Sequence, residues 1–300
     1  MTTATSDTAV PLEDWTTERT ALRRRLADKR STVFTTLALL LLLAPLGWVL
    51  AGVIEQAVGV WNWHMLSETT ATDGLTNAIA GTFVLLAGVL VIAGTIGIAC
   101  GIYIAEWAPR RTRIVLRGAS EVLSGVPSIV IGYVAYVALV VGLHWGYSLL
   151  AAVIALSVLV VPYVTKSTEV AISQVPTSYR EGGEALGMSE AHVMRKIVLR
   201  SAIPGISTGL IIALAISVGE TAPLLYTMSF SNGFPTDQLT HSSMGYLTYV
   251  AYIFWDEPSM ADQNLAHAAA LVLVILVLGL ILLGRLVVRL TQRHAEQAGR

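Results

Sequence analysis

Six long apolar runs constrain the fold of this 300-residue chain more than any other feature of its sequence. A helix needs about 20 apolar residues to cross a hydrocarbon core about 30 Å thick. Six runs reach or approach this length, the fourth being the shortest: Val33–Ile54, Ala78–Ile104, Val122–Leu143, Tyr147–Val164, Ile203–Met228 and Leu265–Leu286. Because a chain in lipid must pair its backbone groups internally, we predict an all-α, polytopic membrane protein with six transmembrane helices.

The charged residues support this topology. Only 13% of the residues are charged, against roughly 25% in a soluble domain. All 19 Lys and Arg residues lie before the first run, after the second or fourth, or at the end of the sixth. Under the positive-inside rule, these segments and both termini are cytoplasmic. We therefore predict a cytoplasmic tail and basic helix over residues 1–32, a membrane domain over residues 33–290 and a cytoplasmic tail over residues 291–300.

Two connecting segments are long. The cytoplasmic one covers about residues 165–202 and the external one about residues 229–264. No basic segment leads straight into a short apolar core with a small-residue cleavage site, so we expect the first run to be retained in the protein.

The cytoplasmic segment contains strong local helix signals. Ser178 followed by Glu181 predicts a capping box at the start of a short helix. Gly187 predicts the end of that helix, because glycine readily adopts the left-handed conformation of a C-cap. Ser189 then predicts the N-cap of a second helix that runs through Leu199.

Glycines mark two places of expected close approach. Gly182 and Gly183 each cost roughly 1 kcal/mol relative to alanine inside a helix, which predicts that a partner protein or a neighbouring helix comes close to the backbone there. Gly97 and Gly101 in the second run form a small-xxx-small pattern, which lets membrane helices approach one another.

Two runs contain residues that interrupt an apolar helix. Pro127 follows a glycine closely in the third run, between Ser124 and Ser128, and irregular backbone survives in lipid only inside protein or beside a wet cavity. The fifth run contains Glu220, sixteen residues after Pro204 and therefore about 24 Å further along a helix. A carboxyl at this depth is a functional-site hypothesis. The alternatives are a packed kink, and a protonated or helix-bridging structural carboxyl.

The external segment predicts one amphipathic helix. Its apolar residues recur at spacings of three and four, typical of a helix lying at the membrane interface, with or without an external docking partner: Met244, Leu247, Val250, Ala251 and Phe254.

The glutamate and glycines of the cytoplasmic segment resemble the EAA loop of permease subunits of ATP-binding-cassette importers. The spacing matches, although glycine replaces both alanines and Arg200 stands where proline is usual. In that family the loop is a coupling helix that docks on the ATPase subunit. The resemblance thus implies ATPase-coupling roles for Arg180, Glu181, Gly182, Gly183 and Gly187. An ordinary cytoplasmic helical hairpin is the alternative.

Three further segments resemble the PstA-type permeases of the bacterial phosphate importer, namely residues 102–108, 124–133 and 219–225. The resemblance extends from Asn77 to the last run and implies the type I ABC importer permease fold. It also implies a translocation pathway that includes Ser124, Pro127, Ser128, Glu220 and Thr221. One position departs from the family: Ile216 stands where a basic residue is common, and no Lys or Arg lies deep in any predicted run.

The function implied by the resemblance is a permease subunit that carries inorganic phosphate across the bacterial plasma membrane, with both termini cytoplasmic. The implied partners are a PstC-type second permease in a heterodimer, a PstB-type ATPase homodimer, an external PstS-type phosphate-binding protein and membrane lipid, with no nucleic acid. ATP would be bound by the partner, because this chain lacks a P-loop.

Other classes have weaker support in the sequence. Motifs for a metal site or a nucleophile are missing, and Cys100 has no partner, so we expect no catalytic residue, metal or cofactor in this chain and no enzymatic activity. A permease for another oxyanion remains an alternative. A proton-coupled secondary transporter with Glu220 as proton site would be expected to show inverted repeats, and we find no convincing repeat.

Overall fold

The computed structural model describes residues 18–298, and side chains over residues 27–290. It consists of two units, residues 1–54 and residues 55–300. Helix α1 (Glu18–Val60) provides the described part of the first unit and contains the predicted first span. The basic helix expected before this span is continuous with it, whereas the rest of the predicted tail lies outside the described residues.

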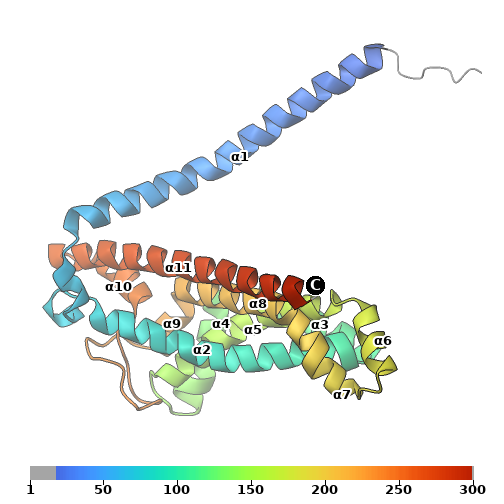
Figure 1. Cartoon of the computed structure of the whole chain (residues 1–300). Coiled ribbons are helices and arrows are strands. Elements are labelled where there is room, and N and C mark those ends of the chain that lie inside the picture. Colours follow the sequence, from blue (N-terminus) through green and yellow to red (C-terminus); the bar gives the residue numbers. More distant parts are fainter. Residues whose placement is uncertain (1–17, 299–300) are drawn as a thin grey trace, which may run out of the picture. The chain divides into compact units, whose positions relative to one another are not determined.

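The second unit is helical and has no strand in its described part. Its long helices are α2 (Thr76–Ile102), α5 (Leu149–Ser173), α8 (Leu199–Gly219) and α11 (Met260–Ala298) (Figure 1). The shorter helices are α3 (Arg110–Gly125), α4 (Ser128–Ala135), α6 (Thr177–Ala185), α7 (Glu190–Val193), α9 (Ala222–Thr227) and α10 (Leu247–Ile253). Among the described residues, five helices are long and apolar enough to cross a membrane, or six if the bent pair α3–α4 is one span.

Short turns of tighter or wider helix complete the fold. π-helical turns follow α2 and α4 and join α7 to α8, at Tyr103–Trp107, Tyr136–Gly142 and Met194–Val198. The 3-10 turns lie between α1 and α2, at Trp63–Leu66 and Thr70–Thr72, and after α10, at Phe254–Asp256.

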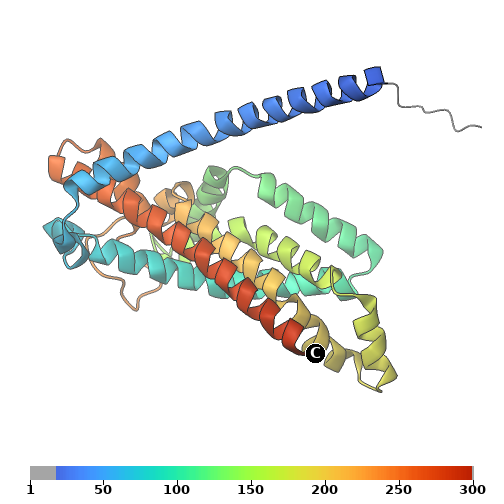
Figure 2. The ribbon, with the colours of Figure 1, turned by 45° about the horizontal axis from the view of Figure 1, so that its top comes forward.

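Helix α5 is the central helix of the second unit and packs against both α2 and α8 (Figure 2). A Cβ atom added to Gly97 of α2 would lie 2.6 Å from the Val164 side chain, and one added to Gly101 would lie 2.5 Å from Thr168. The predicted close approach at these glycines is therefore confirmed. Helix α5, which contains the shortest predicted run, is the most buried of the candidate spans in the described chain. The small residues of α2 allow this close packing.

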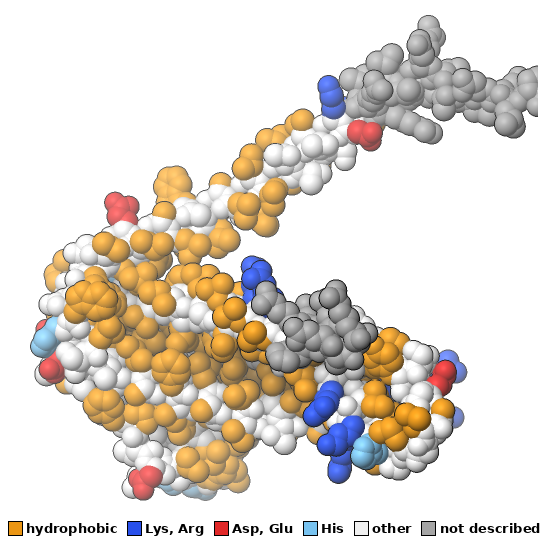
Figure 3. Space-filling model, in the orientation of Figure 1, with side chains coloured by type: hydrophobic (Ala, Val, Ile, Leu, Met, Phe, Trp, Pro, Cys, Tyr) orange, Lys and Arg blue, Asp and Glu red, His pale blue; other side chains and the backbone are white. Residues whose placement is uncertain are grey.

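Hydrophobic side chains cover the outer faces of the long helices (Figure 3). On α11, for example, Ile275 and Leu282 are both more than half exposed. An apolar surface of this extent is unsuited to water and typical of helices that contact lipid.

The third predicted span is sharply bent. Helices α3 and α4 meet at 98°, so Val122–Leu143 is not one straight helix. Pro127 caused the break, as predicted: the residue before a proline avoids the helical region, and Val126 has extended backbone with φ −73° and ψ 130°. Residues of α3 are polar on one face and none of them is buried within the chain.

Two further spans differ from their predicted bounds. The fifth is interrupted, because α8 ends at Gly219 and α9 starts only at Ala222, with extended backbone at Glu220. The fourth continues past Val164 to Ser173 and so includes Lys166 and Glu169. Both charged residues thus lie on the part of α5 that extends beyond the predicted run.

The external segment forms a helix, but the apolar face of this helix is buried in the protein, whereas Tyr252 is exposed. Leu247 and Val250 of α10 are fully buried and pack with residues of α2 and α11. The predicted surface role of this apolar face is therefore wrong. Next to it, burial raises the pKa of the Tyr246 phenol well above its usual range, so the phenol stays neutral and donates a hydrogen bond to the Met228 carbonyl at 3.3 Å.

Candidate functional site

The short helix α6 begins without the predicted capping box. It starts at Thr177 after Pro176, and no side chain caps its N-terminus. Ser178 therefore lies inside the first turn, where its hydroxyl cannot serve as the N-cap, and the prediction for Ser178 and Glu181 is wrong. Proline at this boundary has its φ angle fixed near the helical value, which favours a helix start.

The end of α6 confirms the prediction for Gly187. This residue has a left-handed φ of +73°. Its N–H donates to the Glu184 carbonyl at 2.9 Å, and the Met188 N–H donates to the Gly183 carbonyl at 3.1 Å. These two bonds are the Schellman arrangement, in which glycine is preferred because it has no Cβ.

The second short helix starts where predicted and ends far beyond its predicted end. Ser189 is the N-cap residue of α7, although its side chain makes no capping hydrogen bond. The helix does not stop at Leu199. A π-helical turn connects it to α8, and the span Glu190–Gly219 is helical over 30 residues. The cause is the buried face of this span, which packs Val198 and Ala202 against the end of α5.

The two adjacent glycines of α6 have different surroundings. A Cβ atom added to Gly183 would lie 2.7 Å from Val193, so a neighbouring helix explains this glycine. Gly182 is exposed and would meet nothing within 4 Å. Exposed Glu181 precedes it, and Leu186 near the end of the helix is 82% exposed. The outer face of α6 thus presents a carboxylate, a bare backbone and an apolar side chain.

Arg180 points into the protein. Its guanidinium donates to the Glu106 carboxylate at 2.5 Å and to the Val175 carbonyl at 3.1 Å. Both side chains of the ion pair are at least three-quarters buried. Arg180 therefore holds α6 against the end of α2 and the end of α5, and it is not part of the exposed face.

The two interrupted spans meet around a polar cavity. Ser124, Ser128 and Glu220 line a volume of about 160 Å³ between α3, α4, α5 and α8. The Glu220 carboxylate makes no hydrogen bond or ion pair with any described residue. Ser124 donates to the Glu121 carbonyl of its own helix at 3.0 Å, as the packed-kink alternative expects. Ile216, one turn before Glu220, adds an apolar wall.

Pro127 and Thr221 shape this cavity without lining it. Pro127 is the N-cap residue of α4, and Thr221 is the N-cap residue of α9. The two short helices pack closely, since a Cβ atom added to Gly132 would lie 2.6 Å from the Cα atom of Pro223. The sequence predicted these five residues as pathway residues, and the structure gathers all of them at the two helix breaks.

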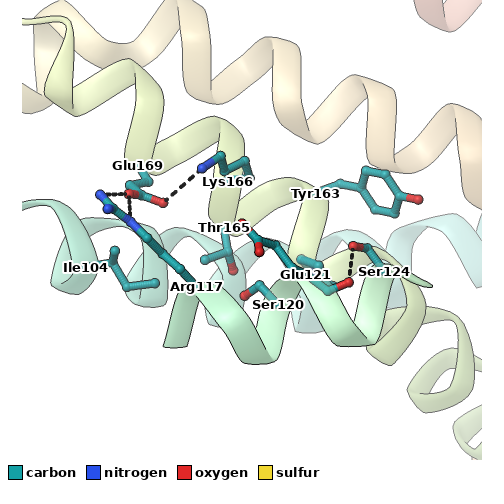
Figure 4. Close-up of a pocket in the computed structure, with 10 residues that line it drawn as sticks. Ile104, Arg117, Ser120, Glu121, Ser124, Tyr163, Thr165, Lys166 and Glu169 are labelled. Atoms are coloured by element: carbon teal, nitrogen blue, oxygen red, sulfur yellow. Dashed lines mark hydrogen bonds and ion pairs between the residues drawn. The ribbon is translucent and has the colours of Figure 1, made fainter. Parts of the chain in front are cut away.

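Sequence reasoning missed a second polar cavity between α3 and α5. It has a volume of about 210 Å³ (Figure 4). Arg117 donates from Nε to the Glu169 carboxylate at 2.6 Å and forms an ion pair with it, and Lys166 lies 3.9 Å from the same carboxylate. The Glu169 side chain is only 5% exposed. The spacing of Lys166 and Glu169, three residues apart just after an apolar run, was the signal available in the sequence.

Comparison with known proteins identifies the family of the chain. Residues 97–297 match the family described as "Binding-protein-dependent transport system inner membrane component". The chain is 50% identical over 276 residues to phosphate transport system permease protein PstA 2 of Mycobacterium bovis, covering 91% of this chain and 92% of that protein. It is 35% identical over 274 residues to phosphate transport system permease protein PstA of Yersinia pestis, covering 88% and 90%.

A solved structure shares the fold. The chain superimposes on a permease chain of the inward-facing MetNI methionine ABC transporter with a TM-score of 0.58 and 20% sequence identity. The superposition covers 72% of this chain and 97% of that one. The lipid-facing helices, the broken spans and the exposed short helix therefore define a multi-pass transport permease. The chain belongs to the family of binding-protein-dependent transport system inner membrane components, and its fold is that of a type I ABC importer permease.

Proposed function

We propose that this chain is the PstA-type permease subunit of an ATP-driven importer that carries inorganic phosphate across the bacterial plasma membrane. The observation that carries this proposal is the 50% identity, over 91% of the chain, to a protein named as a phosphate transport permease. The predicted transport role, with no enzymatic activity in this chain, agrees with the names of these relatives. Neither a proton-coupled mechanism nor a different oxyanion has comparable support.

The outer face of α6 supports the coupling role. Glu181, Gly182 and Leu186 are exposed, and no other part of the described chain explains why Gly182 lacks a side chain. We propose that this face docks on a PstB-type ATPase dimer, which binds ATP. A PstC-type permease would complete the heterodimer and a PstS-type protein would deliver phosphate. In this arrangement α6 and both termini are cytoplasmic.

The cavity at Glu220 supports the pathway role. An unpaired carboxylate and two serine hydroxyls there face a space enclosed by two broken helices. Broken backbone of this kind is tolerated at membrane depth where it lines a cavity. We propose that phosphate passes Ser124, Ser128 and Glu220 as the helices on either side rock between outward-open and inward-open states.

The experiment is reconstitution of the chain with its ATPase and permease partners in proteoliposomes, with ATP inside and the cognate binding protein outside. Radiolabelled phosphate should accumulate only with ATP, and unlabelled phosphate should compete with it while sulfate does not. ATP-dependent uptake of a different solute would keep the importer and overturn the substrate. Uptake driven by a proton gradient without the ATPase would overturn the function.

A further inference from the structure

The cavity between α3 and α5 has a lining of mixed polarity. The polar residues that line it are Arg117, Ser120, Glu121, Ser124, Tyr163, Thr165, Lys166 and Glu169 (Figure 4). Its volume of about 210 Å³ is several times the share of one water molecule, about 30 Å³. The space is therefore large enough for a small polyatomic ion.

One hydrogen-bond donor at this cavity is buried and lacks a partner among the described residues. The Thr165 hydroxyl is fully buried, and Thr165 is only 3% exposed, yet the hydroxyl makes no hydrogen bond. The Lys166 side chain is 61% exposed, and its ammonium lies 3.9 Å from the Glu169 carboxylate. Buried donors normally have acceptors, and an unsatisfied one at a cavity wall indicates a missing group.

Glu169 acts as an internal anion for Arg117. The guanidinium of Arg117 has the planar fork that binds a carboxylate or a phosphate equally well. Here one Glu169 oxygen occupies that fork. Two cationic and two acidic residues line the cavity, so their formal charges balance.

The mixed lining also limits the class of ligand. Arg117, Lys166 and Thr165 offer donors to the oxygen atoms of an anion, whereas Glu121 and Glu169 can only accept hydrogen bonds when ionised. A ligand that satisfies both sets has several acceptor oxygens and at least one O–H group. A partly protonated oxyanion such as phosphate fits this description, and the fully ionised sulfate does not.

This cavity adjoins the one at Glu220. Ser124 and Tyr163 line both of them. Along α5 the two cavities extend from Leu159 to Glu169, ten residues and thus about 15 Å of helix. Positive charge is absent at Ile216 in the first cavity and present at Arg117 and Lys166 in the second.

We propose that the cavity between α3 and α5 is a binding station for a protonated oxyanion that has passed Glu220. Arg117 and Lys166 supply the positive charge and Thr165 a hydrogen bond. Glu169 returns to Arg117 when the anion leaves, and so promotes release. This inference rests on the proposed function. It adds the residues that would hold phosphate after it has passed Glu220.

The test is equilibrium binding of radiolabelled inorganic phosphate to the complete transporter complex in nanodiscs without ATP, followed by uptake kinetics in proteoliposomes. Arg117→Gln and Lys166→Gln should each weaken binding at least tenfold and raise KM. Arg111→Gln is the matched control, because it removes an exposed charge from the same helix outside the cavity; it should leave both values unchanged.

Glu169→Gln should do the opposite, tightening phosphate binding about tenfold while lowering kcat, because release is slower. Thr165→Val should weaken binding several-fold and leave thermal stability equal or higher, since it removes an unsatisfied hydroxyl. An ion pair that serves only the fold predicts that Glu169→Gln weakens binding and stability together, and that result would overturn the proposal.

Failure of this inference is distinguishable from failure of the proposed function. If the wild-type complex takes up no phosphate, the substrate assignment is wrong. If it takes up phosphate while Arg117→Gln and Lys166→Gln behave like Arg111→Gln, the importer stands and the binding station is overturned.

Discussion

Helices α2 and α6 each contain a pair of nearby glycines, but the surroundings of the two pairs differ. On α2, Gly97 and Gly101 face α5, and an added Cβ atom would collide with it. On α6, Gly183 faces Val193, whereas Gly182 faces open space. Where a neighbouring helix of the same chain occupies the space of a Cβ atom, the glycine is needed for packing. One without such a neighbour points to a surface that another protein approaches.

The largest expected effect is at Gly101. Gly101→Leu should strongly lower the unfolding temperature, because the new side chain would meet the Thr165 carbonyl, which lies 2.7 Å from an ideal Cβ position, as well as Thr168. Overpacking typically costs about 1–3 kcal/mol and more where backbone must move. Thermal unfolding in detergent, followed by tryptophan fluorescence, measures it. Gly279→Leu on α11, where an added Cβ meets nothing within 4 Å, is the control. Equal stability of both variants would contradict the packing explanation.

The second effect concerns coupling and leaves folding intact. Gly182→Trp should reduce ATP-driven uptake to less than a tenth and stop the ATPase from co-purifying, because the indole blocks the docking face. The unfolding temperature should stay unchanged, since the added ring points into open space. Gly187 is a poorer probe, because a side chain at its φ of +73° is strained in any case. Normal uptake by Gly182→Trp would show that this face has no partner.

The third effect concerns the ion pair between Arg180 and Glu106, and a second substitution should partly reverse it. Arg180→Gln should lower uptake several-fold and reduce stability by about 2 kcal/mol, the usual value for a lost hydrogen bond to a charged group. The double variant Arg180→Glu with Glu106→Arg should recover part of both, because the pair can form again in reverse. Uptake and unfolding measured on the same preparations give the answer. No recovery would mean that Arg180 acts directly on the partner.

The smallest effect is Gly182→Ala. The change should stabilise the chain by up to about 1 kcal/mol, because alanine favours a helix and nothing here opposes a Cβ atom. Uptake should persist, since alanine is the residue of the EAA motif at this position. The same change at Gly183 should destabilise the chain, because Val193 occupies the space. Chemical denaturation of both variants compares them directly.

Local signals in the sequence predicted the local structure well. The apolar runs gave the long helices, Gly187 gave the end of α6, and Pro127 gave the sharp break in the third span. Each of these depends on a few neighbouring residues, or on hydropathy alone. The start of α6 was misplaced because Pro176 competes with Ser178, and proline sets the boundary without any side-chain hydrogen bond.

Features that depend on distant parts of the chain could not be predicted in this way. Hydropathy ends the fourth span at Val164, but α5 continues because Arg117 from another helix neutralises Glu169 and because glycines of α2 pack along it. The interruption at Glu220 likewise needs α4 and α9 to pack together. The five residues that the sequence singles out therefore lie together at the breaks, and their role in a pathway stays a prediction, whereas the cavity beside them appeared only in the structure.

The helical span from Glu190 to Gly219 connects the region of α6 with the cavity at Glu220, through the π-helical turn at Met194–Val198 and past Pro204. Its 30 residues correspond to about 45 Å. The backbone is irregular near both of its ends: Gly187, next to α6, is left-handed, and Glu220, next to the cavity, is extended. Under the proposed coupling, a displacement of α6 would reach the cavity at Glu220 along this one helical span.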